Sequence, residues 1–143
     1  MIVRQAKAED FDLMEVQPMQ ALRSIKIDLG VGYAALRISH ALTVLEAENV
    51  PLAIAGVTET GPDTVFVWVL LSGRAGKHML GLTRILKRAM HENTRGYKFV
   101  ETLVRSDFGP GHRWARLFGF ECVQQRRSKD PDGNFEDLYR RAA

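Results

Sequence analysis

The segment from Val65 to Met90, VFVWVLLSGRAGKHMLGLTRILKRAM, limits the possible folds more than any other part of the chain. It begins with a continuous apolar run, passes through a short basic loop with two glycines, and ends in an amphipathic helical pattern. A strand that is apolar without alternation is covered on both faces of its sheet, so this strand lies inside a layered α/β structure. A glycine-containing loop between a strand and a helix N-terminus is also the usual arrangement of a phosphate-binding site.

Glycine and proline residues divide the rest of the chain into short elements, which we assign from hydrophobic periodicity. The predicted strands are residues 2–6, 41–46, 51–57, 64–71, 97–105 and both arms of a hairpin around a turn at 130–133. The predicted helices are residues 7–25 with a break or new start at Pro18, 32–41, the segment after residue 78, and 111–120 with a left-handed Gly119 near its end.

A helical crossover between the strands 64–71 and 97–105 requires these two strands to run parallel. The strands 41–46, 51–57 and 64–71 follow one another through tight turns, as in an antiparallel meander. The order therefore predicts one α/β (α+β) domain over residues 1–143, with a mixed, mostly antiparallel sheet of about six to seven strands flanked by helices.

Composition narrows the class of protein. The chain has 143 residues, of which 45% are apolar and 26% charged, as expected for one globular domain with its own core. The charged N-terminal segment is not a signal peptide, and no window approaches the ~18 apolar residues of a membrane span. Cys122 is the only cysteine, which excludes an intrachain disulfide and a cysteine metal cluster. We expect a cytoplasmic protein in which Cys122 is a small buried apolar residue.

The net charge of +3 is unevenly distributed. The stretch from Arg74 to Arg88 contains Lys77, Arg84 and Lys87 as well, and no acidic residue. One interpretation is a solvated basic helix face, and the other is an anion site for the phosphates of a cofactor or of nucleic acid. Because no nucleic-acid-binding motif is visible, we expect no nucleic acid partner. No metal site is expected either, since the histidines have no carboxylates at ligand spacing.

Three segments resemble the GNAT acetyltransferase superfamily: PLAIAGV, VFVWVLLSGRAGKHML and GHRWARLFGFE. A narrower resemblance is carried by AALRISHALTVLEAENVPLAIAGV, LLSGRAGKHM and HRWARLFGFE. These segments look like GNAT-related phage proteins, the group that includes the internal virion protein A of short-tailed phages. For this group the resemblance implies the host cytoplasm or the virion as the location, and virion proteins as possible partners.

The wider resemblance implies acetyl-CoA as cofactor, bound where the cofactor strand and its neighbour part in a V. The residues implied in binding are Leu70, Leu71, Ser72, Gly73, Arg74, Gly76, Lys77 and His78. Of the glycines that the family places in this loop only Gly76 is kept, and His78 and Leu80 occupy the other positions. The tyrosine that protonates the leaving thiolate in this family falls on Ala115. Glu101 is the candidate general base, followed by Glu59 and Asp63.

These residues leave two functions open. The first is an acyl-CoA-dependent N-acyltransferase in which water replaces the missing tyrosine. The second is a catalytically inactive GNAT scaffold that acts as a phage internal virion or assembly protein through its basic helix. Neither Ser39 nor Ser72 has the His and Asp partners of a known triad pattern, so the sequence does not support nucleophilic catalysis. His112 is predicted to be a surface or capping residue, and Trp68 and Trp114 are predicted to pack in the core.

Overall fold

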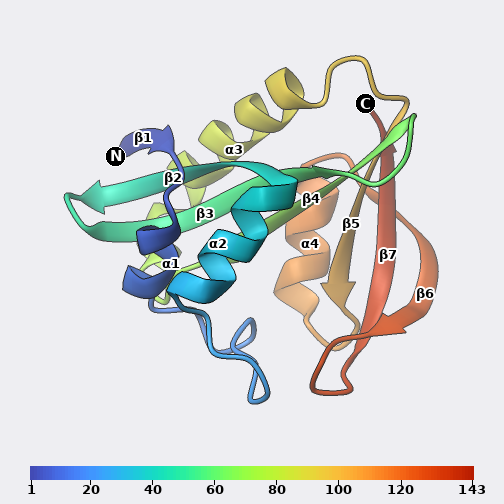
Figure 1. Cartoon of the computed structure of the whole chain (residues 1–143). Coiled ribbons are helices and arrows are strands. Elements are labelled where there is room, and N and C mark those ends of the chain that lie inside the picture. Colours follow the sequence, from blue (N-terminus) through green and yellow to red (C-terminus); the bar gives the residue numbers. More distant parts are fainter.

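The computed structural model describes all 143 residues, Met1–Ala143, as a seven-stranded sheet with helices on both faces (Figure 1). The strands are β1 (Ile2–Gln5), β2 (Ser39–Ala47), β3 (Val50–Glu59), β4 (Thr64–Leu71), β5 (Phe99–Arg105), β6 (Glu121–Lys129) and β7 (Phe135–Ala142). The helices are α1 (Ala8–Leu13), α2 (Leu29–Ile38), the 3₁₀ turn η1 (Ala75–His78), α3 (Met79–Asn93) and α4 (Gly109–Leu117).

The strands lie side by side in the order β1-β2-β3-β4-β5-β7-β6. Neighbouring strands are antiparallel except for β4 and β5, which run parallel because α3 carries the chain back across the sheet. The predicted meander, the parallel pair and the terminal hairpin are therefore confirmed, as is the mixed, mostly antiparallel sheet.

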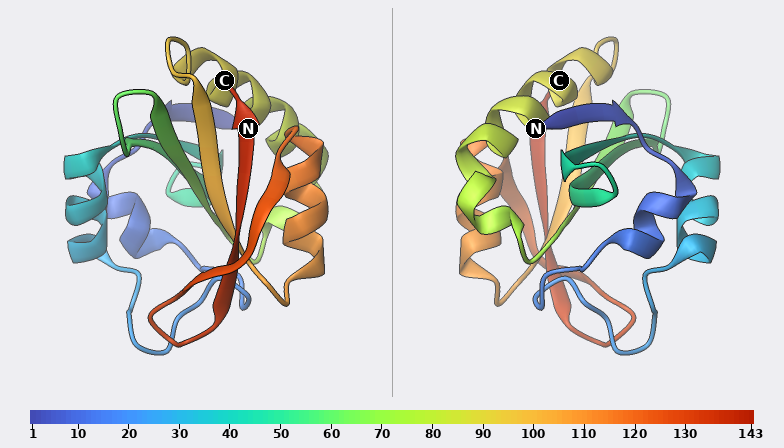
Figure 2. Two further views of the ribbon diagram at one scale, coloured as in Figure 1. Left: turned by 90° about the vertical axis from the view of Figure 1, so that its right-hand side faces the viewer. Right: turned by 90° about the vertical axis from the view of Figure 1, so that its left-hand side faces the viewer.

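The helices form two layers, with α1 and α2 on one face of the sheet and α3 and α4 on the other (Figure 2). The larger core cluster lies under α3 and α4, where Leu82, Leu86 and Ala115 pack on buried strand residues such as Val65 and Val100. The smaller cluster lies under α1 and α2 and is centred on Phe11 and Ile54. The continuous apolar character of β4 follows from this arrangement, because it is covered from both sides.

The prediction of a helix over residues 7–25 is wrong beyond Leu13. The chain leaves α1 at Met14 in an extended conformation and forms an isolated bridge between Val16 and Ser72. Pro18 lacks the N–H that a helix interior needs, and the segment instead pairs with β4. The second helix begins earlier than predicted, because Asp28 caps it by accepting a hydrogen bond from the Val31 N–H at 3.1 Å.

The prediction that Cys122 is buried is also wrong. Cys122 lies in β6, the outermost strand of the sheet, and its side chain is exposed. All residues of β6 from Glu121 to Arg127 are exposed, and this strand has a neighbour on one side only. The left-handed Gly119 after α4 is confirmed by its φ of 86°.

None of the helices combines the length and the apolar character that crossing a bilayer requires.

Candidate functional site

The sheet is split between β4 and β5. These strands pair over only three positions, from Thr64↔Phe99 to Phe66↔Glu101, although both continue further. Beyond that point β4 stays paired with β3 as far as Leu71, and β5 stays paired with β7 along its whole length. The two halves of the sheet therefore part in a V, as the resemblance to the acetyltransferases implied. Thr102 closes the vertex, where its hydroxyl donates to the Val67 carbonyl at 2.8 Å.

A cavity of about 440 Å³ occupies this V and is lined mainly by hydrophobic residues. Residues of β4 with side chains on opposite faces, such as Trp68 and Val69, both line it, so the cavity reaches both faces of the sheet. On one face it lies against α3 and α4, where Met90 and Trp114 contribute. On the other face it is bordered by the β6–β7 turn and by four residues of the segment that follows α1: Gln17, Met19, Gln20 and Leu22.

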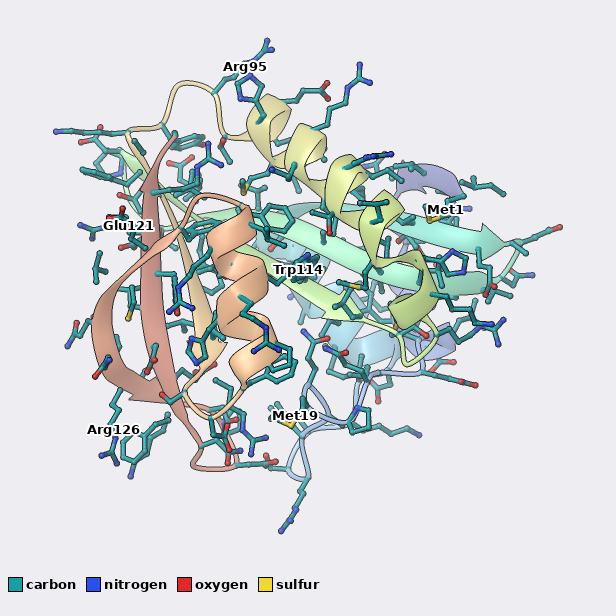
Figure 3. The ribbon with its side chains drawn as sticks, turned by 180° about the vertical axis from the view of Figure 1, so that it is seen from behind. Met1, Met19, Arg95, Trp114, Glu121 and Arg126 are labelled. Carbon is teal, nitrogen blue, oxygen red and sulfur yellow. The ribbon has the colours of Figure 1, made fainter.

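Trp114 connects the two helices beside the cavity. Its indole N–H donates to the Thr83 hydroxyl at 2.9 Å, and its ring meets Phe118 edge-on with centroids 5.0 Å apart. Figure 3 shows Trp114 on α4 beside α3, and Met19 in the segment below them. Trp114 packs against the larger cluster as predicted, but it also lines the cavity. Trp68 packs against the smaller cluster and lines the cavity from the opposite face.

The predicted cofactor-binding loop follows β4 directly, and most of its backbone donors are already used. The N–H groups of Leu71, Ser72, Gly73, Arg74 and Ala75 donate to Gln20 Oε1 (2.6 Å), Leu52 O (2.9 Å), Glu15 O (3.0 Å), Ser72 Oγ (3.1 Å) and Ser72 O (3.0 Å). The surface above the loop is nevertheless open, because a Cβ added at Gly73 or Gly76 would meet no atom within 4 Å. A ligand can therefore approach the backbone of both glycines closely.

The basic side chains of this loop divide into paired and free ones. Arg74 binds Glu46 at 2.8 Å, and His78 Nε2 lies 3.4 Å from the same carboxylate but without hydrogen-bond geometry. The hydrogen bond from Arg74 lowers the pKa of Glu46. Lys77 and Arg84 are exposed and form no ion pair. Two of the predicted cations are thus available to an anion.

The carboxylates that the sequence suggested as bases do not line the cavity. Glu101 lies at the last paired position of β5, where Arg140 binds its Oε2 at 2.7 and 2.9 Å. Glu59 accepts a hydrogen bond from the Tyr97 hydroxyl at 2.7 Å, and Asp63 lies in the β3–β4 turn.

A different carboxylate, Glu136 of β7, does line the cavity. It is partly buried and forms no ion pair or side-chain hydrogen bond. Burial raises its pKa, and the nearby Asp130, which also lines the cavity, raises it further. Sequence reasoning missed Glu136 because only the pairing of β7 with β5, which sets Glu136 opposite Arg105, brings it here. No local motif marks it.

No tyrosine reaches the cavity. Ala115 is buried in its wall at the position where the family resemblance suggested tyrosine. The buried Tyr139 lies outside the lining, with its hydroxyl 2.6 Å from Nδ1 of His112. His112 is not the surface residue that the sequence predicted, since its other ring nitrogen lies 2.9 Å from the carbonyl oxygen of Ser106 and most of the ring is buried. No group of three or more His, Cys, Asp or Glu side chains is placed to hold a metal ion.

Several solved structures are similar to this chain over its whole length. The N-acetyltransferase from Staphylococcus aureus Mu50 has a TM-score of 0.73 at 14% identity, over 99% of this chain and 97% of that one. A GNAT superfamily phosphinothricin acetyltransferase from Sinorhizobium meliloti, in complex with AcCoA, has a TM-score of 0.73 at 14% identity, over 99% of this chain and 87% of that one. The ribosomal-protein-alanine N-acetyltransferase from Brucella melitensis has a TM-score of 0.73 at 13% identity, over 100% of both chains. No protein-family model and no curated protein matches the sequence.

The chain therefore has the fold of the GNAT acetyltransferases, which confirms the predicted fold class. At these identities the similarity establishes the fold and leaves the activity to the residues of the site. The narrower resemblance to phage proteins stays a prediction.

Proposed function

We propose that this protein is an acyl-CoA-dependent N-acyltransferase. The observation that carries the proposal is the cavity in the V between β4 and β5, which reaches both faces of the sheet. A transfer reaction needs two ligands to meet at one point, and a cavity that reaches both faces of the sheet offers each of them a side of its own. The similarity to acetyltransferase structures, one of them solved with AcCoA, supports the same function.

The residues present fit a CoA thioester. The apolar walls of the V suit the acyl and pantetheine portions, and the backbone of Val69 and Leu71 offers polar groups along β4. The open surface over Gly76, together with the free cations Lys77 and Arg84, suits the phosphates. When bound, acetyl-CoA would supply an acyl group activated as a thioester.

Glu136 is our candidate for the base that accepts a proton from the attacking amine. Its carboxylate is in the cavity and has no competing partner, and its raised pKa brings it nearer to neutral pH, where proton acceptance is most effective. Glu101 remains an alternative, but its charge is already neutralised by Arg140. Because Ala115 has no proton to donate, a water molecule would protonate the leaving thiolate.

Calorimetry with acetyl-CoA tests the proposal. We expect micromolar binding that Gly76→Glu abolishes, because the new carboxylate fills the open surface and repels phosphate. Gly61→Glu is the matched control, since Gly61 is also surrounded by open space but lies in the β3–β4 turn, away from the cavity lining. If the wild-type protein releases no heat at millimolar acetyl-CoA, the proposed function is refuted.

The second candidate is a catalytically inactive scaffold of the phage type, with virion proteins as partners. Ala115 in place of a proton-donating side chain is the observation that favours it. Salt-sensitive association with virion proteins that is lost on Lys77→Glu would support this role, whereas acetyl transfer by the purified protein would exclude inactivity. A location in the cytoplasm or the virion likewise stays a prediction.

A further inference from the structure

The free edge of β4 is not left open in the V. Ser72 donates its N–H to Leu52 of β3, so by alternation the N–H and C=O groups of Val69 and Leu71 point away from β3, into the V. These are the groups that β5 would bind if the two strands stayed together. In a sheet such unpaired groups need other partners.

A segment that we call the strap, residues 15–24, supplies these partners. Its backbone first pairs with the end of β4: Gly73 N–H donates to Glu15 O at 3.0 Å, and Gln17 N–H donates to Leu71 O at 2.9 Å. The side chain of Gln20 then continues along the edge. Its Nε2 donates to the Val69 carbonyl and its Oε1 accepts from the Leu71 N–H, each at 2.6 Å. The carboxamide of Gln20 thus binds β4 as the peptide group of a neighbouring strand would.

The far end of the strap is held by the turn between β6 and β7. The carboxylate of Asp132 accepts hydrogen bonds from the Arg23 N–H at 2.6 Å, the Ser24 N–H at 3.0 Å and the Ser24 hydroxyl at 2.6 Å. Between these two attachments the strap contains no helix or strand, and Pro18 and Ala21 are exposed. A segment with few buried contacts opens at low free energy compared with the core.

We propose that Gln20 is a displaceable gate that occupies the amide-binding edge of β4 in the free protein. This inference rests on the proposed function. The pantetheine arm of a CoA thioester contains secondary amides, and each offers one N–H and one C=O, the same pair of groups that Gln20 presents to Leu71 and Val69. The Gln20 carboxamide and a pantetheine amide cannot bind the same edge of β4 at once, so the ligand enters only when Gln20 leaves that edge.

Only molecules with an open gate bind the ligand, so the apparent affinity is the intrinsic affinity multiplied by the fraction of open molecules. Two hydrogen bonds of ordinary net strength bias this equilibrium toward the closed state by roughly tenfold. We therefore expect Gln20→Ala to bind acetyl-CoA about tenfold more tightly than the wild-type protein in calorimetry.

Ala21→Gly is the matched control. Ala21 follows Gln20 in the strap, is exposed and does not line the cavity, so glycine loosens the strap and leaves the Gln20 carboxamide in place. Its affinity for acetyl-CoA should stay within twofold of wild type. A second readout follows the side-chain NH₂ signals in ¹⁵N–¹H spectra of the wild-type protein. Addition of acetyl-CoA should move the Gln20 signal to the position of a solvent-exposed amide and leave in place the signal of Gln124, which is exposed on β6 outside the cavity.

The outcomes separate the gate from the function. If Gln20→Ala binds acetyl-CoA no more tightly than wild type, or if the Gln20 signal does not move on binding, the gate is refuted while the proposed function stands. If Ala21→Gly gains as much affinity as Gln20→Ala, loosening of the strap and not the Gln20 carboxamide is responsible, and the gate is again refuted. If no variant binds acetyl-CoA, both proposals fall together.

Discussion

Replacement of Asp10 by alanine should destabilise the protein by about 3 kcal/mol. Asp10 is 1% exposed, and four donors bind its carboxylate: two nitrogens of Arg4 at 2.7 and 2.8 Å, the Lys7 N–H at 2.9 Å and the Thr43 hydroxyl at 2.6 Å. It therefore joins β1, the start of α1 and β2. Alanine removes all four bonds at once.

The magnitude follows from the groups that are left without a partner. The buried Thr43 hydroxyl loses its acceptor, which costs roughly 1–3 kcal/mol. The N-terminal turn of α1 loses the cap that binds Lys7 N–H, which costs about 1 kcal/mol. The Arg4 side chain is partly exposed, so water hydrates its guanidinium when the carboxylate is removed, and the loss of this ion pair adds little to the destabilisation. Asparagine keeps an acceptor for Thr43 but gives up the charge, and Asp10→Asn should cost about half as much.

The stability that is lost when Asp10 is replaced should depend on pH. Burial by itself would raise the pKa of Asp10, but the hydrogen bonds from Arg4, Thr43 and Lys7 outweigh it and lower the pKa. A carboxylate whose pKa is lower in the folded than in the unfolded state stabilises the fold above the unfolded value of about 3.9. This stabilisation disappears as the pH falls from about 4 through the lower folded pKa.

Urea denaturation at pH 7 and pH 3 measures both effects. Asp10→Asn should be clearly less stable than wild type at pH 7, and the difference should shrink at pH 3. Thr43→Val is the control that removes one donor and leaves the ion pair, and combined with Asp10→Ala it should cost less than the sum of the two changes. A loss below about 1 kcal/mol for Asp10→Ala at pH 7, or a difference between Asp10→Asn and wild type that does not change with pH, would contradict this reasoning.

Two further predictions concern the V. In a thiol-release assay, Glu136→Gln should lower kcat for acyl transfer by about a hundredfold and remove the acidic limb of the pH profile. Glu101→Gln should leave kcat and the acidic limb unchanged, and the opposite pattern would make Glu101 the base. Gly56→Ala should destabilise the protein by about 1–3 kcal/mol in thermal unfolding, because the new Cβ would overlap the indole of Trp68, while Gly61→Ala meets open space and should be neutral. Equal stability of the two alanine variants would mean that Trp68 moves without cost.

Local patterns were sufficient to predict most of the fold. The meander, the crossover helix α3 and the left-handed Gly119 each follow from periodicity or from turn residues that act over a few positions. The prediction failed over residues 14–25, where an apparent helical spacing of Met14, Met19 and Leu22 competes with pairing to β4, more than 40 residues away in the chain. The spacing of apolar residues within a segment carries no information about a pairing partner elsewhere in the chain, here the end of β4.

The site was predicted less completely for the same reason. The loop around Gly76 follows β4 directly and could be located from the sequence, whereas Glu136 reaches the cavity only through the pairing of β5 with β7. The exposure of Cys122 depends on β6 being the outermost strand, and the partner of Arg74, Glu46, comes from β2. Each of these residues has its role set by strand order, which is a property of the whole sheet.

The V and the strap have one physical origin. β4 is hydrogen-bonded to β3 and β5 to β7 over nearly their full lengths, and each antiparallel unit keeps its own twist, so the parallel pair between them holds at only three positions. The parting creates the cavity, but it also leaves backbone groups of Val69 and Leu71 without strand partners. Any sequence with this fold must satisfy those groups in the free state and release them to bind an amide. Gln20 meets both requirements, because a side-chain carboxamide has the hydrogen-bonding groups of a peptide bond and leaves by rotation about its own bonds without unfolding a strand.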